Sequence, residues 1–85
     1  MKEELISSIS EILNEWNPLG NQAESITDLE GYKYEAMDIL SAIKITKVHT
    51  EIAVSDVLTQ AFRISLDDDQ LKYYSSKIEQ LINVQ

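Results

Sequence analysis

Acidic side chains are the residues of this chain whose types and spacing could most readily do chemistry. Three consecutive aspartates, Asp67 to Asp69, could offer oxygen ligands to a divalent cation. Consecutive side chains on a helix, however, diverge by about 100°, and the stretch does not have the Asp-x-Asp-x-Asp-Gly pattern of a calcium-binding loop. Negative charge in the first turn of a helix is stabilised by the helix dipole. We therefore interpret the three aspartates as the start of a helix.

A second acidic pair, Glu35 and Asp38, is spaced three residues apart, which places both carboxylates on one face of a helix. Two carboxylates at this spacing could carry out acid–base chemistry or bind Mg²⁺. A facing helix supplies no second pair, so a solvated helix face is the favoured interpretation.

Other catalytic groupings are missing from the sequence. His49 is the only histidine and there is no Cys, so zinc would have to be held by one imidazole and carboxylates. No G-x-S-x-G turn presents a nucleophile, and two glycines eleven positions apart, Gly20 and Gly31, cannot form a phosphate-binding loop. We interpret His49 as a polar residue in a turn between helices. The sequence predicts no catalytic, metal or cofactor site, and hence a protein that is not an enzyme.

The segment Glu-Trp-Asn-Pro-Leu-Gly-Asn, residues 15 to 21, concentrates residue types that are scarce elsewhere in the chain. It could be a binding loop or the end of a helix. Pro18 disfavours helical geometry at Asn17, and Gly20 and Asn21 can both adopt positive φ, so a helix must end near Trp16. We expect Trp16 to close one end of the core, with its ring buried and its indole N–H bonded to a carbonyl or to water. A ligand-stacking role is the alternative.

The charge balance disfavours two classes of partner. Fifteen acidic residues against seven basic ones give a formal net charge of −8 in 85 residues, so neither nucleic acid nor an anionic membrane is an expected partner. A basic protein partner is compatible with this charge, as is an acidic surface that serves solubility alone. No apolar run is long enough to cross a membrane, and the N-terminus has no apolar signal block, so a cytoplasmic location is expected.

Helices are needed to position all of these groups, and apolar residues at helical spacing predict four of them, at 2–16, 32–45, 50–64 and 67–83. The four apolar stripes comprise Leu5, Ile6, Ile9, Ile12, Leu13 and Trp16; Tyr32, Ala36, Ile39, Leu40 and Ile43; Ala53, Val54, Val57, Leu58, Ala61 and Phe62; and Leu71, Tyr74, Ile78, Leu81 and Ile82. The predicted fold is a compact all-α array of about four helices in a single domain, 1–85.

Three local features refine this prediction. Residues 43–57 are rich in β-branched side chains and could form a strand. Apolar and polar residues do not alternate strictly there, however, and the sequence offers no partner strand, so we expect a helix. We expect this helix to break near Thr46 to Thr50, and either threonine could cap the helix that follows. Ser25 to Asp28 has capping-box spacing but allows at most one short turn. Asp67 and Gln70 also have capping-box spacing, flanked by a Leu66 and Leu71 staple.

Several of these motifs together resemble a small helical family of Bacillus-type bacteria, catalogued as domain of unknown function 1871. The similarity covers nearly the whole chain and rests on Trp16, Asn17 and Pro18 in the turn and on Tyr34, Glu35 and Ala36 at the opening of the second helix. The chain departs from the family's pattern in having Asn at position 17, where Asp is commoner, and in a longer stretch from Gln22 to Glu30. The resemblance implies about four helices and no assigned activity.

Three hypotheses about function follow. The first is a non-enzymatic interaction protein that binds a basic protein partner, in the manner of small inhibitors or immunity proteins. The second is a small-ligand or divalent-metal site formed by Trp16, Asn17 and Pro18 with Tyr34, Glu35 and Asp38. The third is a homodimer, because a core this small is often supplemented by association.

Overall fold

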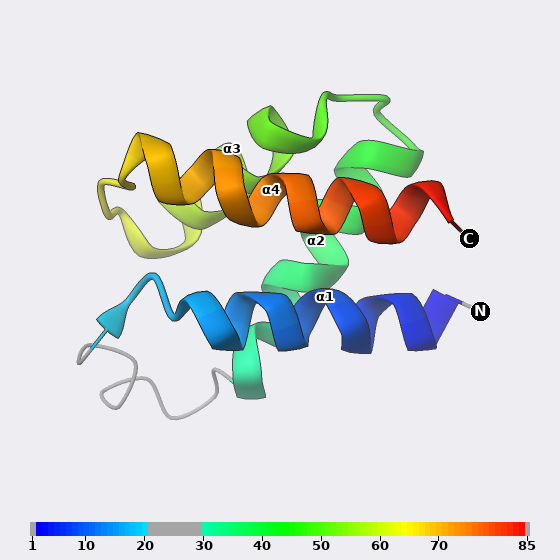
Figure 1. Cartoon of the computed structure of the whole chain (residues 1–85), viewed down its shortest axis with the longest axis horizontal. Coiled ribbons are helices and arrows are strands. Elements are labelled where there is room, and N and C mark those ends of the chain that lie inside the picture. The colour runs from blue at the N-terminus through cyan, green and yellow to red at the C-terminus, as the bar shows by residue number, and fades with distance from the viewer. Residues whose placement is uncertain (1, 21–29, 85) are drawn as a thin grey trace.

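The computed structural model describes residues 2–20 and 30–84, and within them the chain forms an all-α array of four helices, as predicted (Figure 1). The elements are α1 (Lys2–Trp16), a short 3-10 helix η2 (Glu30–Tyr32), α2 (Lys33–Lys44), α3 (Thr50–Phe62) and α4 (Asp68–Asn83). The radius of gyration, 11.8 Å, is close to the value of about 12 Å expected for a folded chain of this length. The predicted Ser25 to Asp28 turn lies outside the described residues.

Each helix contacts two others, so the four close into a ring. α1 packs against α2 and α4, and α3 packs against the same two helices on the opposite side. Figure 1 shows α1 and α4 side by side, with their chain directions opposed, so that the start of α1 and the end of α4 lie at the same end of the molecule. We call the line of contact between α1 and α4 the seam; Glu11 and Glu15 of α1 and Lys77 and Leu81 of α4 lie along it.

The predicted apolar stripes supply the core between these helices. Buried hydrophobic side chains come from every helix, from the turn after α1 and from the residue before α2; they are Leu5, Ile9, Leu13, Trp16, Leu19, Tyr32, Ala36, Ile39, Leu40, Ala53, Val54, Leu58, Leu71 and Ile78. Burial of apolar area at about 25 cal/mol per Å² is the main force that holds the helices together. Ala61, which the stripe of α3 included, is exposed instead.

The break between α2 and α3 falls where the sequence predicted it, but the expected threonine cap does not form. The N-cap residue of α3 is His49, and no side chain accepts a capping hydrogen bond there. Thr50 is the first residue of the helix and is buried, which takes its hydroxyl away from the capping position. At the other end α3 stops at Phe62 rather than at residue 64, because Arg63 has left-handed backbone geometry (φ 53°).

The start of α4 follows the predicted cap only in part. The Asp67 carboxylate accepts a hydrogen bond from the Gln70 backbone N–H at 3.0 Å, as an N-cap residue should. In a full capping box the Gln70 side chain would return to the N-cap backbone. Here its Oε1 instead accepts a hydrogen bond from the indole of Trp16. The residue that was expected to finish the cap therefore ties α4 to the end of α1.

Candidate functional site

Trp16 is a structural anchor between α1 and α4. Its side chain is buried, with 8% of its surface exposed, and its Nε1 donates a hydrogen bond to Gln70 Oε1 at 3.1 Å. The indole also stacks on Tyr74, with ring centroids 5.0 Å apart and planes inclined by 11°. These contacts agree with the expectation that Trp16 closes the end of the core and that its N–H reaches a carbonyl oxygen. One face of the Trp16 indole ring and its N–H are therefore already engaged within the protein.

Asn17 holds the turn that follows α1. Its backbone is left-handed (φ 48°), and its N–H donates to the Leu13 carbonyl at 2.7 Å. The Gly20 N–H donates to the Asn17 carbonyl at 2.9 Å, and Asn17 Nδ2 donates to the Gly20 carbonyl at 3.3 Å. Asn17 Oδ1 accepts a hydrogen bond from the Tyr32 hydroxyl at 2.7 Å. The polar atoms that could have met a ligand are therefore used to close the turn on itself.

Tyr32 is the buried centre of this turn. Only 1% of its surface is exposed, and its hydroxyl both donates to Asn17 and accepts from the Leu19 backbone N–H at 3.3 Å. Its ring meets Phe62 edge to face, with centroids 6.0 Å apart. Burial raises the pKa of the Tyr32 hydroxyl above its ordinary value of 10.0; the hydrogen bond from Leu19 lowers that pKa, and the nearby Glu35 charge raises it. The hydroxyl is thus held neutral and fully used.

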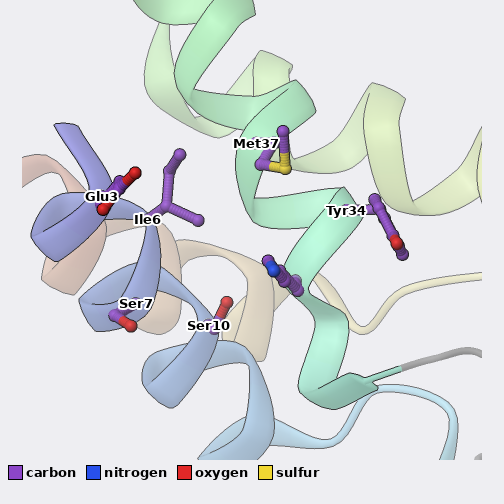
Figure 2. A pocket seen from close by; sticks show the side chains of 7 residues that line it. Glu3, Ile6, Ser7, Ser10, Tyr34 and Met37 are labelled. Carbon is purple, nitrogen blue, oxygen red and sulfur yellow. The ribbon is translucent and has the colours of Figure 1, made fainter.

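The three residues predicted on the second helix differ in their exposure. Tyr34 is about half exposed (51%), Glu35 is half-buried and Asp38 is exposed. Of the six predicted site residues, Tyr34 alone lines the groove of about 680 Å³ between α1 and α2 (Figure 2). The groove is lined by Glu3, Ile6, Ser7 and Ser10 of α1 and by Lys33, Tyr34 and Met37 of α2.

A polar and aromatic cluster on α4 extends from Trp16 to the surface. Tyr73 is 57% exposed and meets Tyr74 edge to face at 4.9 Å between centroids. Lys77 Nζ lies 4.9 Å from the centre of the Tyr73 ring and 2.8 Å from Glu15 Oε2. The hydrogen bond with Glu15 raises the pKa of Lys77 above its ordinary value of 10.5. The cluster therefore continues the buried Trp16 stack into an exposed tyrosine beside an ion pair.

Sequence reasoning missed Gln70 as a partner of Trp16 and Tyr32 as a partner of Asn17. Tyr32 was expected on the apolar stripe as an ordinary helix residue, whereas it precedes α2 in left-handed geometry (φ 64°). The signal that could have found it is its place after Gly31, because two adjacent left-handed residues turn the chain sharply. No local pattern points from Gln70 to Trp16, since the two are 54 positions apart.

Residues 2–20 and 30–84 offer neither a metal-binding cluster nor a membrane-spanning helix. No three His, Asp or Glu side chains in this part of the chain lie together in a way that could hold a metal ion. None of its helices is long and apolar enough to cross a membrane.

Comparisons with models of protein families, with curated proteins and with solved structures find no match for this chain. The similarity to domain of unknown function 1871 stays a prediction, and so does the homodimer.

Proposed function

We propose that this chain is a non-enzymatic interaction protein that binds a basic protein partner in the cytoplasm, as small inhibitor or immunity proteins do. The observation that carries this proposal is the acidic flank of α1. Glu4, Glu11 and Glu15 are exposed and lie seven and four positions apart, which places them on one side of the helix. Such a ridge of charge, on a chain with net charge −8, attracts a positively charged surface.

The state of the Trp16 turn also supports binding by the surface rather than by the turn. Trp16 donates a hydrogen bond to Gln70, and Asn17 and Tyr32 form hydrogen bonds with each other and with the backbone. A ligand that displaced the bonds of the buried Tyr32 hydroxyl would leave that group unsatisfied, at a cost of about 1–3 kcal/mol. Contact through exposed acidic side chains carries no such cost.

Co-purification tests the proposal. The immobilised protein is incubated with lysate of its native host at about 50 mM and about 500 mM salt, because surface charge pairs are screened at the higher concentration. We expect a captured protein with a basic isoelectric point that is released by salt, and whose purified form binds with a salt-dependent affinity. Capture of nothing, or only of partners whose binding ignores salt, contradicts the proposal.

The groove between α1 and α2 favours a second candidate, a small-ligand site. Ser10 lines this groove, and its buried Oγ has no hydrogen-bond partner within residues 2–20 and 30–84. Because an unsatisfied buried hydroxyl is costly, a ligand group that bonded it would gain free energy. Ile6 and Met37 would supply the apolar contacts of such a ligand.

This site would overlap the sequence-based alternative only at Tyr34. Amide chemical shifts during titration with magnesium, calcium or nucleotides test it, with Ser10→Ala as the matched variant. Shifts confined to the groove that vanish in Ser10→Ala would support the site, and a flat titration would exclude these ligands.

A further inference from the structure

We infer, building on the proposed function, that the seam between α1 and α4 is the docking surface and that its occupant is a basic amphipathic helix of the partner. The two helices run side by side in opposite directions (Figure 1), and Glu15 and Lys77 meet across the seam. A shallow hollow of about 320 Å³ lies along it, lined by Ser8, Glu11, Ile12 and Glu15 of α1 and by Lys77 and Leu81 of α4. A third helix can pack into the groove between two such antiparallel helices.

The α1 side of the seam is acidic. Glu4, Ser8, Glu11 and Glu15 follow one another at spacings of four, three and four, so they form one ridge. Glu11 and Glu15 line the hollow itself. Lys77 is the basic residue of the hollow, and its ammonium is engaged by Glu15 at 2.8 Å. Charge along the seam is therefore predominantly negative, which fits lysine or arginine side chains on the occupant.

The α4 side of the seam carries apolar side chains on both sides of Lys77. Tyr73, Lys77 and Leu81 are spaced by four positions each, so they share one side of α4, and Val84 follows at the C-cap of the helix. Tyr73 is 57% exposed and Val84 is 78% exposed, while Leu81 is half-buried in the hollow. Large exposed apolar side chains in a row commonly mark a contact surface. Tyr73 and Leu81 are eight positions apart on the helix, which is a span of about 12 Å.

Together the two ridges specify the chemistry of the occupant. The occupant's apolar side chains, at helical spacing, would contact Tyr73, Leu81 and Val84. Its basic side chains, on the adjacent face of the same helix, would reach the glutamates of α1. An arginine is favoured opposite Glu11, which is exposed and lines the hollow, because a guanidinium can bind a carboxylate through two parallel hydrogen bonds. Glu15 Oε2 and the Tyr73 ring are already engaged by the Lys77 ammonium.

The test uses a synthetic 18-residue helix with arginines on one face and leucines on the other, and a permuted peptide of the same composition with no continuous apolar face. The protein variants are Glu11→Lys, in the hollow, and Glu79→Lys, on α4 but beside His49 and Thr50 of α3. Both glutamates are exposed, and each variant changes the formal net charge by two, from −8 to −6. Long-range attraction is thereby matched, and only the position of the charge differs.

We expect the amphipathic peptide to bind the unaltered protein and Glu79→Lys with similar affinity, and to bind Glu11→Lys about tenfold more weakly or worse. The permuted peptide should bind the unaltered protein about tenfold more weakly than the amphipathic peptide does, and Tyr73→Ser should weaken binding of the amphipathic peptide by a similar factor. Amide chemical shifts should change along α1 and α4. Helical content and melting temperature, measured by circular dichroism, establish that each variant is folded.

Equal weakening by Glu11→Lys and Glu79→Lys, or equal binding of both peptides, would overturn the seam as the docking surface. The same is true if the unaltered protein binds neither peptide. The proposed function fails separately, when no basic protein partner is captured from the host. A basic partner that binds both lysine variants equally well would leave the proposed function standing and refute this inference.

Discussion

The Tyr32 hydroxyl donates a 2.7 Å hydrogen bond to the Asn17 side chain, and both residues have left-handed backbones, with φ of 64° and 48°. Left-handed geometry costs a residue with a Cβ about 1–2 kcal/mol, and asparagine tolerates it better than tyrosine because its short polar side chain can form local hydrogen bonds. Each of the two residues therefore carries strain, and the bond between them joins the turn after α1 to the residue before α2. The contact fixes where the chain leaves one helix and enters the next.

Tyr32→Phe should destabilise the protein by about 1–3 kcal/mol, because Asn17 Oδ1 and the Leu19 N–H both lose their buried partner. The ring and its contact with Phe62 remain, so a loss of packing does not explain the change. The free energy of unfolding in urea measures the effect. Tyr73→Phe is the matched control, since Tyr73 is exposed, and it should have little effect. Equal stability of Tyr32→Phe and the unaltered protein would mean that the hydroxyl bonds contribute nothing.

Stability should fall in alkaline solution partly because of Tyr32. Its pKa in the folded protein lies above the ordinary 10.0, so its contribution is complete below about pH 10 and is lost as the pH rises through the folded value. Lys77, whose pKa is also raised, adds a loss in the same direction. Unfolding free energies at about pH 8 and about pH 11 should therefore differ less in Tyr32→Phe than in the unaltered protein. An identical pH dependence in both would contradict this assignment.

Substitutions of Asn17 should rank by what they keep of its two roles. Asn17→Asp retains an acceptor for the Tyr32 hydroxyl and loses only the 3.3 Å bond to Gly20, so we expect a change within about 0.5 kcal/mol. Asn17→Gly relieves the left-handed strain but removes the acceptor. Asn17→Ala keeps the strain and loses the acceptor, and should be the least stable, by about 1–3 kcal/mol. Thermal and urea unfolding of the three variants give the order, and an alanine variant as stable as the aspartate variant would refute it.

The first aspartate of the Asp67 to Asp69 run should matter more than the second. Asp67→Ala removes the side-chain bond to the Gln70 N–H and should cost about 0.5–2 kcal/mol. Asp68→Ala removes only a favourable charge near the helix start, worth about 0.3–1 kcal/mol, and that smaller effect should decline in high salt. Urea unfolding at two salt concentrations separates these contributions. Equal costs for the two variants would show that charge, and not capping, governs this helix start.

The fold was predictable from the sequence because burial follows helical periodicity. The stripe of α1 places Leu5, Ile9, Leu13 and Trp16 in the core, and the break after α2 follows from the change of face near Thr46 to Thr50. The Asp67 cap was predictable for the same local reason. These features depend on residues a few positions apart, where sequence patterns carry most of their information.

The candidate site was less predictable because its contacts are long-range. Trp16 meets Gln70 and Tyr74, and Asn17 meets Tyr32, across separations that no periodic pattern encodes. The sequence-based prediction named Tyr34 and not Tyr32 because Tyr34, with Glu35 and Ala36, matches the resembled family's pattern at the opening of the second helix. The left-handed turn before α2 instead directs the earlier tyrosine inward, where its hydroxyl is buried.

The stack of Trp16 on Tyr74 provides an intrinsic spectroscopic probe of whether α1 is docked on α4. Two aromatic rings held 5.0 Å apart in a fixed orientation should produce a near-ultraviolet circular dichroism band, and one of them is the sole tryptophan. That band depends on α1 being docked on α4, whereas the far-ultraviolet signal depends only on helix content. Loss of the first with retention of the second would therefore reveal a state in which the helices persist but have come apart.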